Sequence, residues 1–314
     1  MKGLDLCQDF FESQKDILFS KLPEISDYAA FGLFGQGSEC LGLDDEISQD
    51  HDFGPRFFII FDTKYAQSHP ELVEAARQIY SGIPKSYKGF NYSDSHMSFM
   101  RHGVYTIKDL LLFYTGRSHV PSCSREWFET DDYSLLCLTN GRVFYDKSGV
   151  LEEFRKKLEG YYPQQVQQKK ISALLAQIAK SGQYNLARQL KRKDYVSAHL
   201  ELSSFLQAYY SVLYILIKKY KPYPKFLHSY LAKLNAYPVD LLQDLESLAV
   251  YNLQTQGSEI QAIVESLCSY LRYCVALEYP LSSQDSFLQL AAQELHEKLH
   301  DPYLRSLHLL RGGA

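Results

Sequence analysis

The sequence has no apolar run long enough to cross a membrane. Its longest apolar stretch, residues 205–217, is interrupted by Gln207 and Ser211, whereas a membrane-spanning helix needs about 20 apolar residues. The first sixteen residues contain charged side chains and no apolar core of the kind found in signal peptides. The six cysteines are scattered, and none forms a Cys-x-x-Cys pair, which argues against zinc knuckles and thioredoxin-like sites. These absences predict a cytoplasmic protein with reduced thiols and no membrane partner.

The chain as a whole also has little net excess of charge of either sign. The formal net charge of −4 argues against a basic nucleic-acid coat protein, and we expect no DNA partner. The distribution is uneven, however: residues 39–52 hold six acids and no Lys or Arg, whereas residues 164–225 hold eleven Lys or Arg and two acids. An acidic loop facing a basic helical segment suits a site for a metal and a polyphosphate. An equally weighted alternative is that the acidic and the basic segment are solvated surfaces that do not face each other.

The chain length of 314 residues and the hydrophobic fraction of 46% suffice for two domains with separate cores. In the first half, strand and helix patterns alternate. Asn140-Gly141 between two short apolar runs, residues 135–138 and 142–145, predicts a hairpin. The other predicted elements are helices over 4–22, 70–80 and 108–114 and strands over 29–35, 56–62 and 97–107.

After about residue 150 the patterns become helical throughout. Leu202, Phe205, Tyr209, Val212 and Leu216 fall on one stripe, which predicts a central helix of a bundle. Further helices are predicted over 239–253, 259–277, 285–300 and 303–310. We therefore predict an α/β domain over residues 1–155 followed by an all-α helical bundle domain over residues 156–314.

The most informative stretch joins a small-residue turn to a pair of acids. Gly37-Ser38 follows a predicted strand, where small residues let backbone amides approach a phosphate. After eleven intervening residues comes Asp50-His51-Asp52, ahead of the apolar run within residues 56–62. Alternate residues of a strand share a face, so the two carboxylates would lie side by side and repel unless a cation neutralises them. Mg²⁺ prefers such oxygen ligands, shared with substrate phosphates.

This combination of Gly-Ser, a spacer and Asp-x-Asp resembles the nucleotidyltransferase superfamily, which shares the fold of DNA polymerase beta. Together with residues 140–146 and 220–225, it looks like a bacterial branch in which the catalytic domain precedes a helical domain. That branch is distantly like the antibiotic nucleotidyltransferases. The resemblance covers most of the chain and is densest over residues 32–62.

The resemblance implies an enzyme that transfers a nucleoside monophosphate, AMP by preference, from an NTP to an acceptor hydroxyl and releases pyrophosphate. It implies that Gly37 and Ser38 bind the triphosphate and that Asp50 and Asp52 bind Mg²⁺, with Mn²⁺ as an alternative. ATP or another NTP would be the donor. The acceptor stays open between a small molecule, a protein hydroxyl and an RNA end.

One expected residue is missing. Many members of the superfamily carry a third acid on the next strand, but residues 98–107 contain no Asp or Glu. His102 is a candidate base, with a structural role as the alternative. Asp146 is another candidate, with a role in a turn as the alternative. Lys225, between prolines and aromatic residues, is either a phosphate ligand or a solvated lysine.

Two other functions remain open. The first is a nucleotide-binding module that keeps the fold and has reduced catalysis. The second is a ribonuclease or toxin-type protein that uses Arg192 and His199 on the helical part, although Lys193 departs from the residue usually found after the Arg. The tyrosines at 209, 210 and 214 form either an acceptor surface or part of the bundle core, and we expect Tyr209 in the core.

Overall fold

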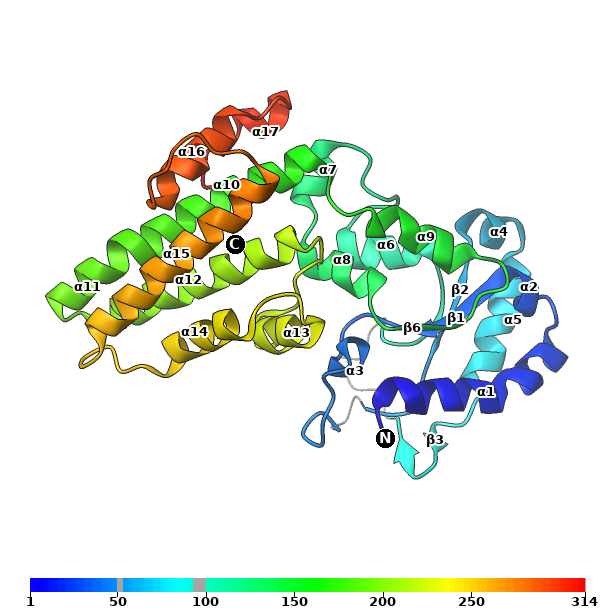
Figure 1. Ribbon diagram of the computed structural model, residues 1–314. Helices are drawn as coiled ribbons and strands as arrows, with labels where there is room; N and C mark the ends of the chain where they lie inside the picture. Colours follow the sequence, from blue (N-terminus) through cyan, green and yellow to red (C-terminus); the bar gives the residue numbers. More distant parts are fainter. Residues whose placement is uncertain (50–52, 93–99, 314) are drawn as a thin grey trace. The chain divides into compact units, whose positions relative to one another are not determined.

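A computed structural model describes residues 1–49, 53–92 and 100–313 (Figure 1). The chain forms two compact units. Met1–Pro121 and Asp131–Gly160 make the first, and Ser122–Thr130 and Tyr161–Ala314 make the second. A small mixed sheet and many helices are compatible with the predicted fold class. The predicted boundary after residue 155 stays a prediction.

The first unit contains a four-stranded mixed sheet. Its strands are β1 (Ala29–Leu33), β2 (Phe58–Phe61), β5 (Gly103–Thr106) and β6 (Arg142–Tyr145), in the order β5-β2-β1-β6. Strand β1 is antiparallel to both β2 and β6, and β2 is parallel to β5. All residues of β1 and β2 are buried, as expected for central strands covered on both faces.

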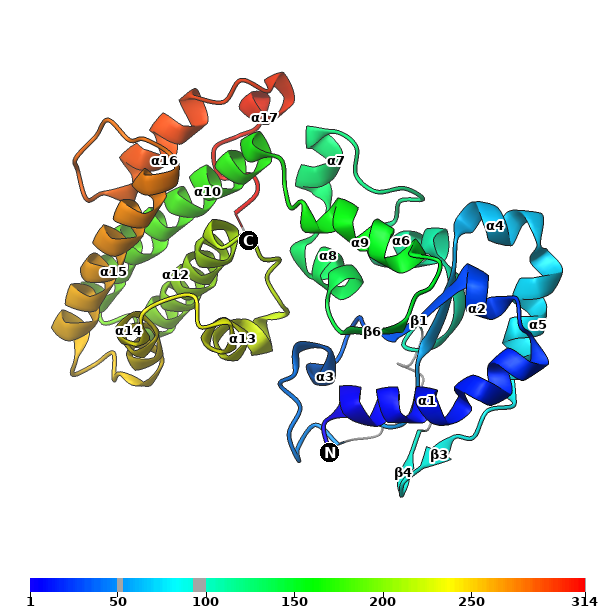
Figure 2. The ribbon, with the colours of Figure 1, turned by 45° about the vertical axis from the view of Figure 1, so that its right-hand side comes forward.

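Helices pack on both faces of this sheet (Figures 1 and 2). On one face, Phe11 of the first helix contacts Phe31 and Phe57, with ring centroids 5.0 and 5.5 Å apart. On the other face, Phe34 stacks on Phe58 at 4.6 Å. A separate two-stranded hairpin consists of β3 (Ser86–Tyr87) and β4 (Phe90–Asn91). The helices of this unit are α1 (Gly3–Lys21), α2 (Ile25–Tyr28), α3 (Ser38–Leu41), α4 (Thr63–Ser68), α5 (Pro70–Ser81), α6 (Ile107–Thr115), α8 (Asp132–Thr139) and α9 (Val150–Glu159).

The strand register brings four loops to one edge of the sheet. Gly32, near the end of β1, lies opposite Phe58 at the start of β2. Phe58 in turn pairs with Gly103, the first residue of β5. Leu33 lies opposite Arg142, the first residue of β6. The turn that follows β1 therefore meets the segments that precede β2, β5 and β6 at this edge.

The hairpin predicted around Asn140-Gly141 is wrong. Residues 135–138 belong to helix α8, which Asp131 caps by accepting a hydrogen bond from the Ser134 amide at 3.0 Å. Strand β6 forms as expected but pairs with β1. The apolar run is buried as a face of this helix. Asn140 has an extended backbone, and its side chain is hydrogen-bonded to Gly35, so it forms no two-residue hairpin turn.

The second unit is helical. Phe205, Tyr209 and Val212 of the long helix α12 are fully buried, which confirms the predicted apolar stripe at these positions. Helix α10 packs against α12 and α16. The helices are α7 (Ser124–Glu129), α10 (Gln164–Ile178), a π-helical segment (Ala179–Leu186), α11 (Ala187–Arg192), α12 (Tyr195–Leu216), a 3₁₀ turn (Pro224–Phe226), α13 (Leu227–Leu234), α14 (Val239–Val250), α15 (Gly257–Glu278), α16 (Leu288–Glu297) and α17 (Pro302–Ser306).

By length and composition, α15 is the one helix of the described chain that is apolar enough to cross a membrane. A core helix of a soluble bundle passes the same test. One face of α15 is buried within the second unit through Ile260, Val264, Leu267, Leu271 and Val275. This pattern is typical of a core helix, so α15 is weak evidence for a membrane span.

Candidate functional site

The turn that follows β1 has a backbone that only glycine adopts easily. Gly35 and Gly37 have φ values of 105° and 140°. A Cβ atom at position 37 would lie 2.5 Å from a carboxylate oxygen of Glu39, and one at position 35 would meet the Tyr114 hydroxyl. Ser38 then begins helix α3. Among the described residues, the Ser38 hydroxyl has no hydrogen-bond partner, so it is available to a ligand.

Asn140 holds this turn from the start of β6. Its side-chain oxygen accepts a hydrogen bond from the Gly35 amide at 2.8 Å, and its side-chain nitrogen donates to the Gly35 carbonyl at 2.8 Å. The Asn140 carbonyl in turn accepts from the Arg155 guanidinium at 2.7 Å. Burial lowers the pKa of Arg155 to about 10, and its guanidinium lies over the Phe34 ring. The turn is therefore fixed by a side chain 105 residues away in sequence.

We expect Asn140→Ala to lower the free energy of unfolding by about 2–4 kcal/mol. The change leaves the buried amide and carbonyl of Gly35 without partners, and each unsatisfied buried group costs about 1–3 kcal/mol. Urea unfolding measures the difference. Thr139→Val is the matched control, because the Thr139 hydroxyl donates only to carbonyls of its own helix. Equal stability of the Ala and Val variants would show that Asn140 does not hold the turn.

A buried ion pair joins the same turn to the segment before β2. The Glu39 carboxylate accepts from the guanidinium of Arg56, and both side chains are buried. Arg56 also donates to the Gly54 carbonyl at 3.1 Å and lies over the Tyr92 ring. Burial opposes the charge of Arg56, yet the Glu39 carboxylate and weaker neighbouring charges raise the pKa of Arg56 above its usual value. The pair thus ties Gly37-Ser38 to the chain just after Asp52.

Asp50 and Asp52 lie outside the described residues. In the rest of the chain, from 1–49, 53–92 and 100–313, no cluster of three or more His, Cys, Asp or Glu side chains is able to hold a metal ion. The two buried acids of the preceding loop are already engaged: Glu39 with Arg56, and Asp44 with the Gly3 amide at 2.8 Å. The Mg²⁺ assignment therefore depends on Asp50 and Asp52.

His102 lies at the start of β5, at the same edge of the sheet. Its ring is 5.7 Å from the Tyr80 ring and 4.6 Å from the Tyr92 ring. Its Nδ1 is 3.1 Å from the Tyr80 hydroxyl, which donates to the Phe57 carbonyl at 2.7 Å. Burial raises the pKa of Tyr80 well above its usual range, so the phenol stays protonated. These contacts favour the structural alternative for His102, joining β5 to the start of β2.

Asp146 has the turn role. Its carboxylate accepts from the amides of Val150, Leu151 and Glu152 at 3.0–3.1 Å and so caps the start of α9. With all three amides satisfied by one side chain, Asp146 explains the entry of the chain into that helix. These contacts favour the turn alternative for Asp146.

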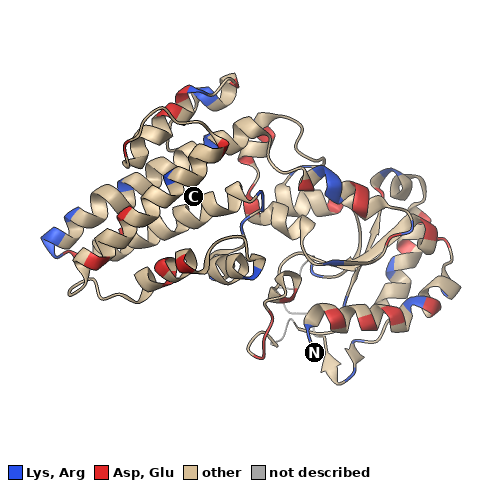
Figure 3. Ribbon diagram, in the orientation of Figure 1, with Lys and Arg blue, Asp and Glu red and all other residues tan. Residues whose placement is uncertain are grey.

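Lys225 belongs to the second unit, in the turn Pro224–Phe226 that leads into α13. Its side chain is exposed, and Nζ lies 4.8 Å from the centre of the Phe226 ring. An exposed ammonium resting on its neighbour fits a solvated lysine and also leaves the charge accessible to a phosphate. Lys and Arg recur along the helices α10 and α11 of this unit (Figure 3).

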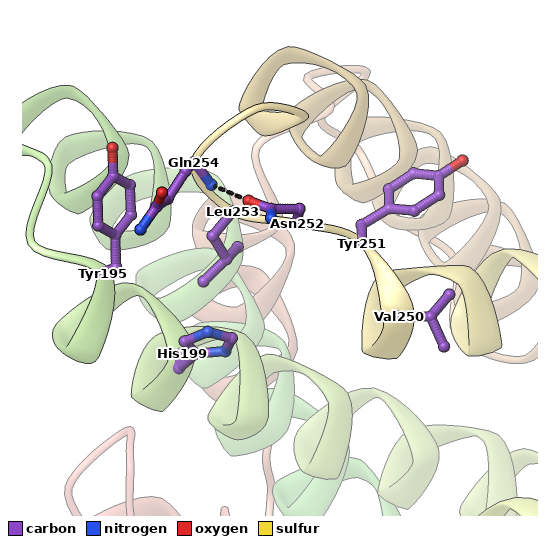
Figure 4. Close-up of a pocket in the computed structure, with 7 residues that line it drawn as sticks. All are labelled: Tyr195, His199, Val250, Tyr251, Asn252, Leu253 and Gln254. Atoms are coloured by element: carbon purple, nitrogen blue, oxygen red, sulfur yellow. Dashed lines mark hydrogen bonds between the residues drawn. The ribbon is translucent and has the colours of Figure 1, made fainter.

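A cavity of about 390 Å³ lies beside α12 in the second unit. Figure 4 shows His199 and Tyr195 of α12 facing the loop that carries Leu253 and Gln254. The described residues that line the cavity include His199 but not Arg192. The cavity therefore does not bring together the pair on which the ribonuclease alternative depends.

Three of the tyrosines of α12 are core residues. Tyr209, Tyr210 and Tyr214 are buried. The Tyr209 hydroxyl donates to the Leu267 carbonyl at 3.0 Å, and that of Tyr214 donates to the Leu227 carbonyl at 2.8 Å. The core role expected for Tyr209 is confirmed. The same role extends to Tyr214, so an exposed acceptor surface made of these three rings is not present.

Sequence reasoning missed the residues that shape the site. The sequence predicts Asn140 as a hairpin turn residue and places Glu39 in an acidic loop that either faces a metal and a polyphosphate or is solvated. Arg56 was counted only as the first residue of a strand. One feature of the sequence could have indicated a role for Glu39 and Arg56 in the site, because each lies within six residues of the predicted motif.

Residues 127–227 match a family described as a domain of unknown function, DUF4037. No curated protein matches the chain significantly. A crystal structure at 1.90 Å resolution, described as that of a nucleotidyltransferase-like protein from Exiguobacterium sibiricum 255-15, is similar with 10% sequence identity and a TM-score of 0.37. The similarity covers 92% of this chain and 89% of the other. At this TM-score it supports no conclusion about activity.

Proposed function

We propose that the protein is a Mg²⁺-dependent nucleotidyltransferase that moves a nucleoside monophosphate, AMP by preference, from an NTP to an acceptor hydroxyl. The observation that carries the proposal is the Glu39–Arg56 pair. It joins the Gly37-Ser38 turn to Arg56, which lies four residues after Asp52 in the sequence, and so supports the proposal that the two halves of the motif belong to one site. The acceptor is a small molecule, a protein hydroxyl or an RNA end, and the expected location is the cytoplasm.

The residues of the turn would bind the triphosphate. The accessible Ser38 hydroxyl and the Gly37-Ser38 backbone supply donors to phosphate oxygens, and Asn140 keeps them in place. Asp50 and Asp52 would hold Mg²⁺, which neutralises charge on the triphosphate and on the leaving pyrophosphate. In the transfer, the acceptor oxygen bonds to the α-phosphorus, the bond between the α- and β-phosphates breaks, and the hydroxyl proton passes to solvent.

One observation favours a second candidate, a binding module with reduced catalysis. The described part of the third candidate strand, Met100–Thr106, contains no acid, and the contacts of His102 favour a structural role. Titration of the protein with ATP and with its α,β-methylene analogue, each with and without Mg²⁺, tests binding separately from turnover. Metal-dependent binding of both nucleotides, with no pyrophosphate from ATP when candidate acceptors are added, would favour the module, whereas no binding of either nucleotide would contradict both functions.

We expect Lys225→Ala to weaken binding of the triphosphate by about 1.5–3 kcal/mol, the usual contribution of a hydrogen bond to a charged group. The expectation rests on the exposed ammonium of Lys225. Calorimetric titration with the α,β-methylene analogue measures the change. Lys233→Ala is a control, because Lys233 is also an exposed lysine and lies on the neighbouring helix α13. Equal affinities of the two variants would remove Lys225 from the site.

A further inference from the structure

A second cavity of the helical unit lies between α12, α13 and α14 and has a volume of about 370 Å³. This volume is within the range of about 300–1,000 Å³ that is usual for small-molecule sites. Leu202, Leu227 and Leu248 supply buried apolar surface, and Ala249 lies at the exposed rim. The cavity is therefore suited to the apolar body of a small ligand.

Two of the polar residues that line the cavity contact each other. The Tyr210 hydroxyl is 2.8 Å from Nδ1 of His228, and both residues line the cavity. Burial, and then the charge of Glu246, raise the pKa of Tyr210 well above its usual range, so the phenol keeps its proton. In the tautomer in which the Tyr210 hydroxyl donates to Nδ1, the ring proton of His228 is on Nε2. In that tautomer His228 offers a hydrogen-bond donor to a ligand.

No Asp, Glu, Lys or Arg is among the described residues that line the cavity. Glu246 is close enough to affect Tyr210, but its side chain is exposed on α14. Burying an ion without a partner of opposite charge is costly, so this cavity disfavours cationic and anionic ligands alike. A polycation of the aminoglycoside type would find no carboxylate among the lining residues.

We infer that this cavity binds an uncharged, ring-bearing small molecule with a carbonyl or similar oxygen that accepts a hydrogen bond from His228. The ring lies against Leu202, Leu227 and Leu248, and the oxygen lies at the end occupied by the Tyr210–His228 pair. The inference does not depend on the proposed transferase activity, because every residue in it belongs to the helical unit.

Three probes of nearly the same size test the inference on the full chain at about pH 8. They are benzamide, which is neutral and has a carbonyl oxygen, benzamidine, which is a cation, and benzoate, which is an anion. We expect benzamide to bind with a dissociation constant on the order of 1 mM, as a fragment of this size allows. Saturation-transfer NMR titrations should show benzamidine and benzoate at least about tenfold weaker. Equal binding of the three probes, or no binding of benzamide, would overturn the inference.

Two variants locate the site. Ala249→Trp fills the cavity from its exposed rim, and His228→Phe removes the donor while keeping a ring. Each should weaken benzamide binding at least about tenfold. Leu200→Trp is the matched control, since Leu200 is exposed on α12 and does not line the cavity. Unchanged benzamide binding in His228→Phe, or loss of binding in Leu200→Trp, would place the ligand elsewhere.

Discussion

Replacing Arg56 with Met is expected to lower the free energy of unfolding by about 3–5 kcal/mol, the usual cost of removing one partner from a buried ion pair. The variant leaves the Glu39 carboxylate buried without its counterion. It also removes the hydrogen bond from Arg56 to the Gly54 carbonyl and the contact with the Tyr92 ring. Urea unfolding monitored by circular dichroism gives the difference.

A double-variant cycle separates the pair from its surroundings. Glu39→Gln alone should destabilise the protein, whereas Glu39→Gln combined with Arg56→Met should cost less than the two single changes added together. Arg77→Met is the control, because Arg77 and Glu74 form an exposed pair at 3.6 Å, and such pairs contribute about 0–1 kcal/mol. Additive single changes would show that Glu39 and Arg56 do not act as a pair.

Changing Asp52 to Asn is expected to abolish metal-dependent nucleotide turnover, and Asp50→Asn should do the same. Each removes a charged oxygen ligand that Mg²⁺ requires beside the substrate phosphates. The melting temperature should stay similar or rise, because a repulsive pair of like charges is relieved. Glu46→Gln is the control, since Glu46 is exposed in the same acidic loop.

The readout is the initial rate of pyrophosphate release, together with a melting curve for each variant. Undiminished release by the Asp52→Asn variant would remove the carboxylate pair from the mechanism. Equal loss in Glu46→Gln would show that the charge of the loop as a whole, and not the pair, is what matters.

Helices and strands with a clear hydrophobic pattern were predicted well from the sequence. The helix predicted over residues 70–80 is α5, Pro70–Ser81, and the strand predicted over residues 56–62 contains β2, Phe58–Phe61. The sequence predicts one strand of a hairpin over residues 135–138, which belong to helix α8, Asp132–Thr139, because four consecutive apolar residues fit a buried strand and a buried helix equally. The local pattern does not distinguish a strand from a helix here. The cap from Asp131 and the hydrogen bond between Asn140 and Gly35 favour the helix.

The glycine turn after β1 was predicted because its signal is local, whereas the ligand roles of its residues stay predictions. Gly37 follows a strand and has positive φ, as a close backbone approach requires. The supports of the turn are not local: Asn140 reaches Gly35 across 105 residues, and Arg56 reaches Glu39 across 17. Neither an Asn-Gly pair nor a Glu in an acidic loop indicates, from the sequence around it, a hydrogen-bond partner far away in the chain. Only the strand register brings these residues to one edge.

The most direct test of the proposed function is incubation of the full chain with each α-³²P-labelled NTP, Mg²⁺ and candidate acceptors of the three classes. We expect the protein to release pyrophosphate and to transfer label to an acceptor, with ATP as the preferred donor. Both activities should be lost in the Asp50→Asn and Asp52→Asn variants. Label transfer that persists in those variants, or binding of nucleotide with neither pyrophosphate nor labelled product, would contradict the proposed function.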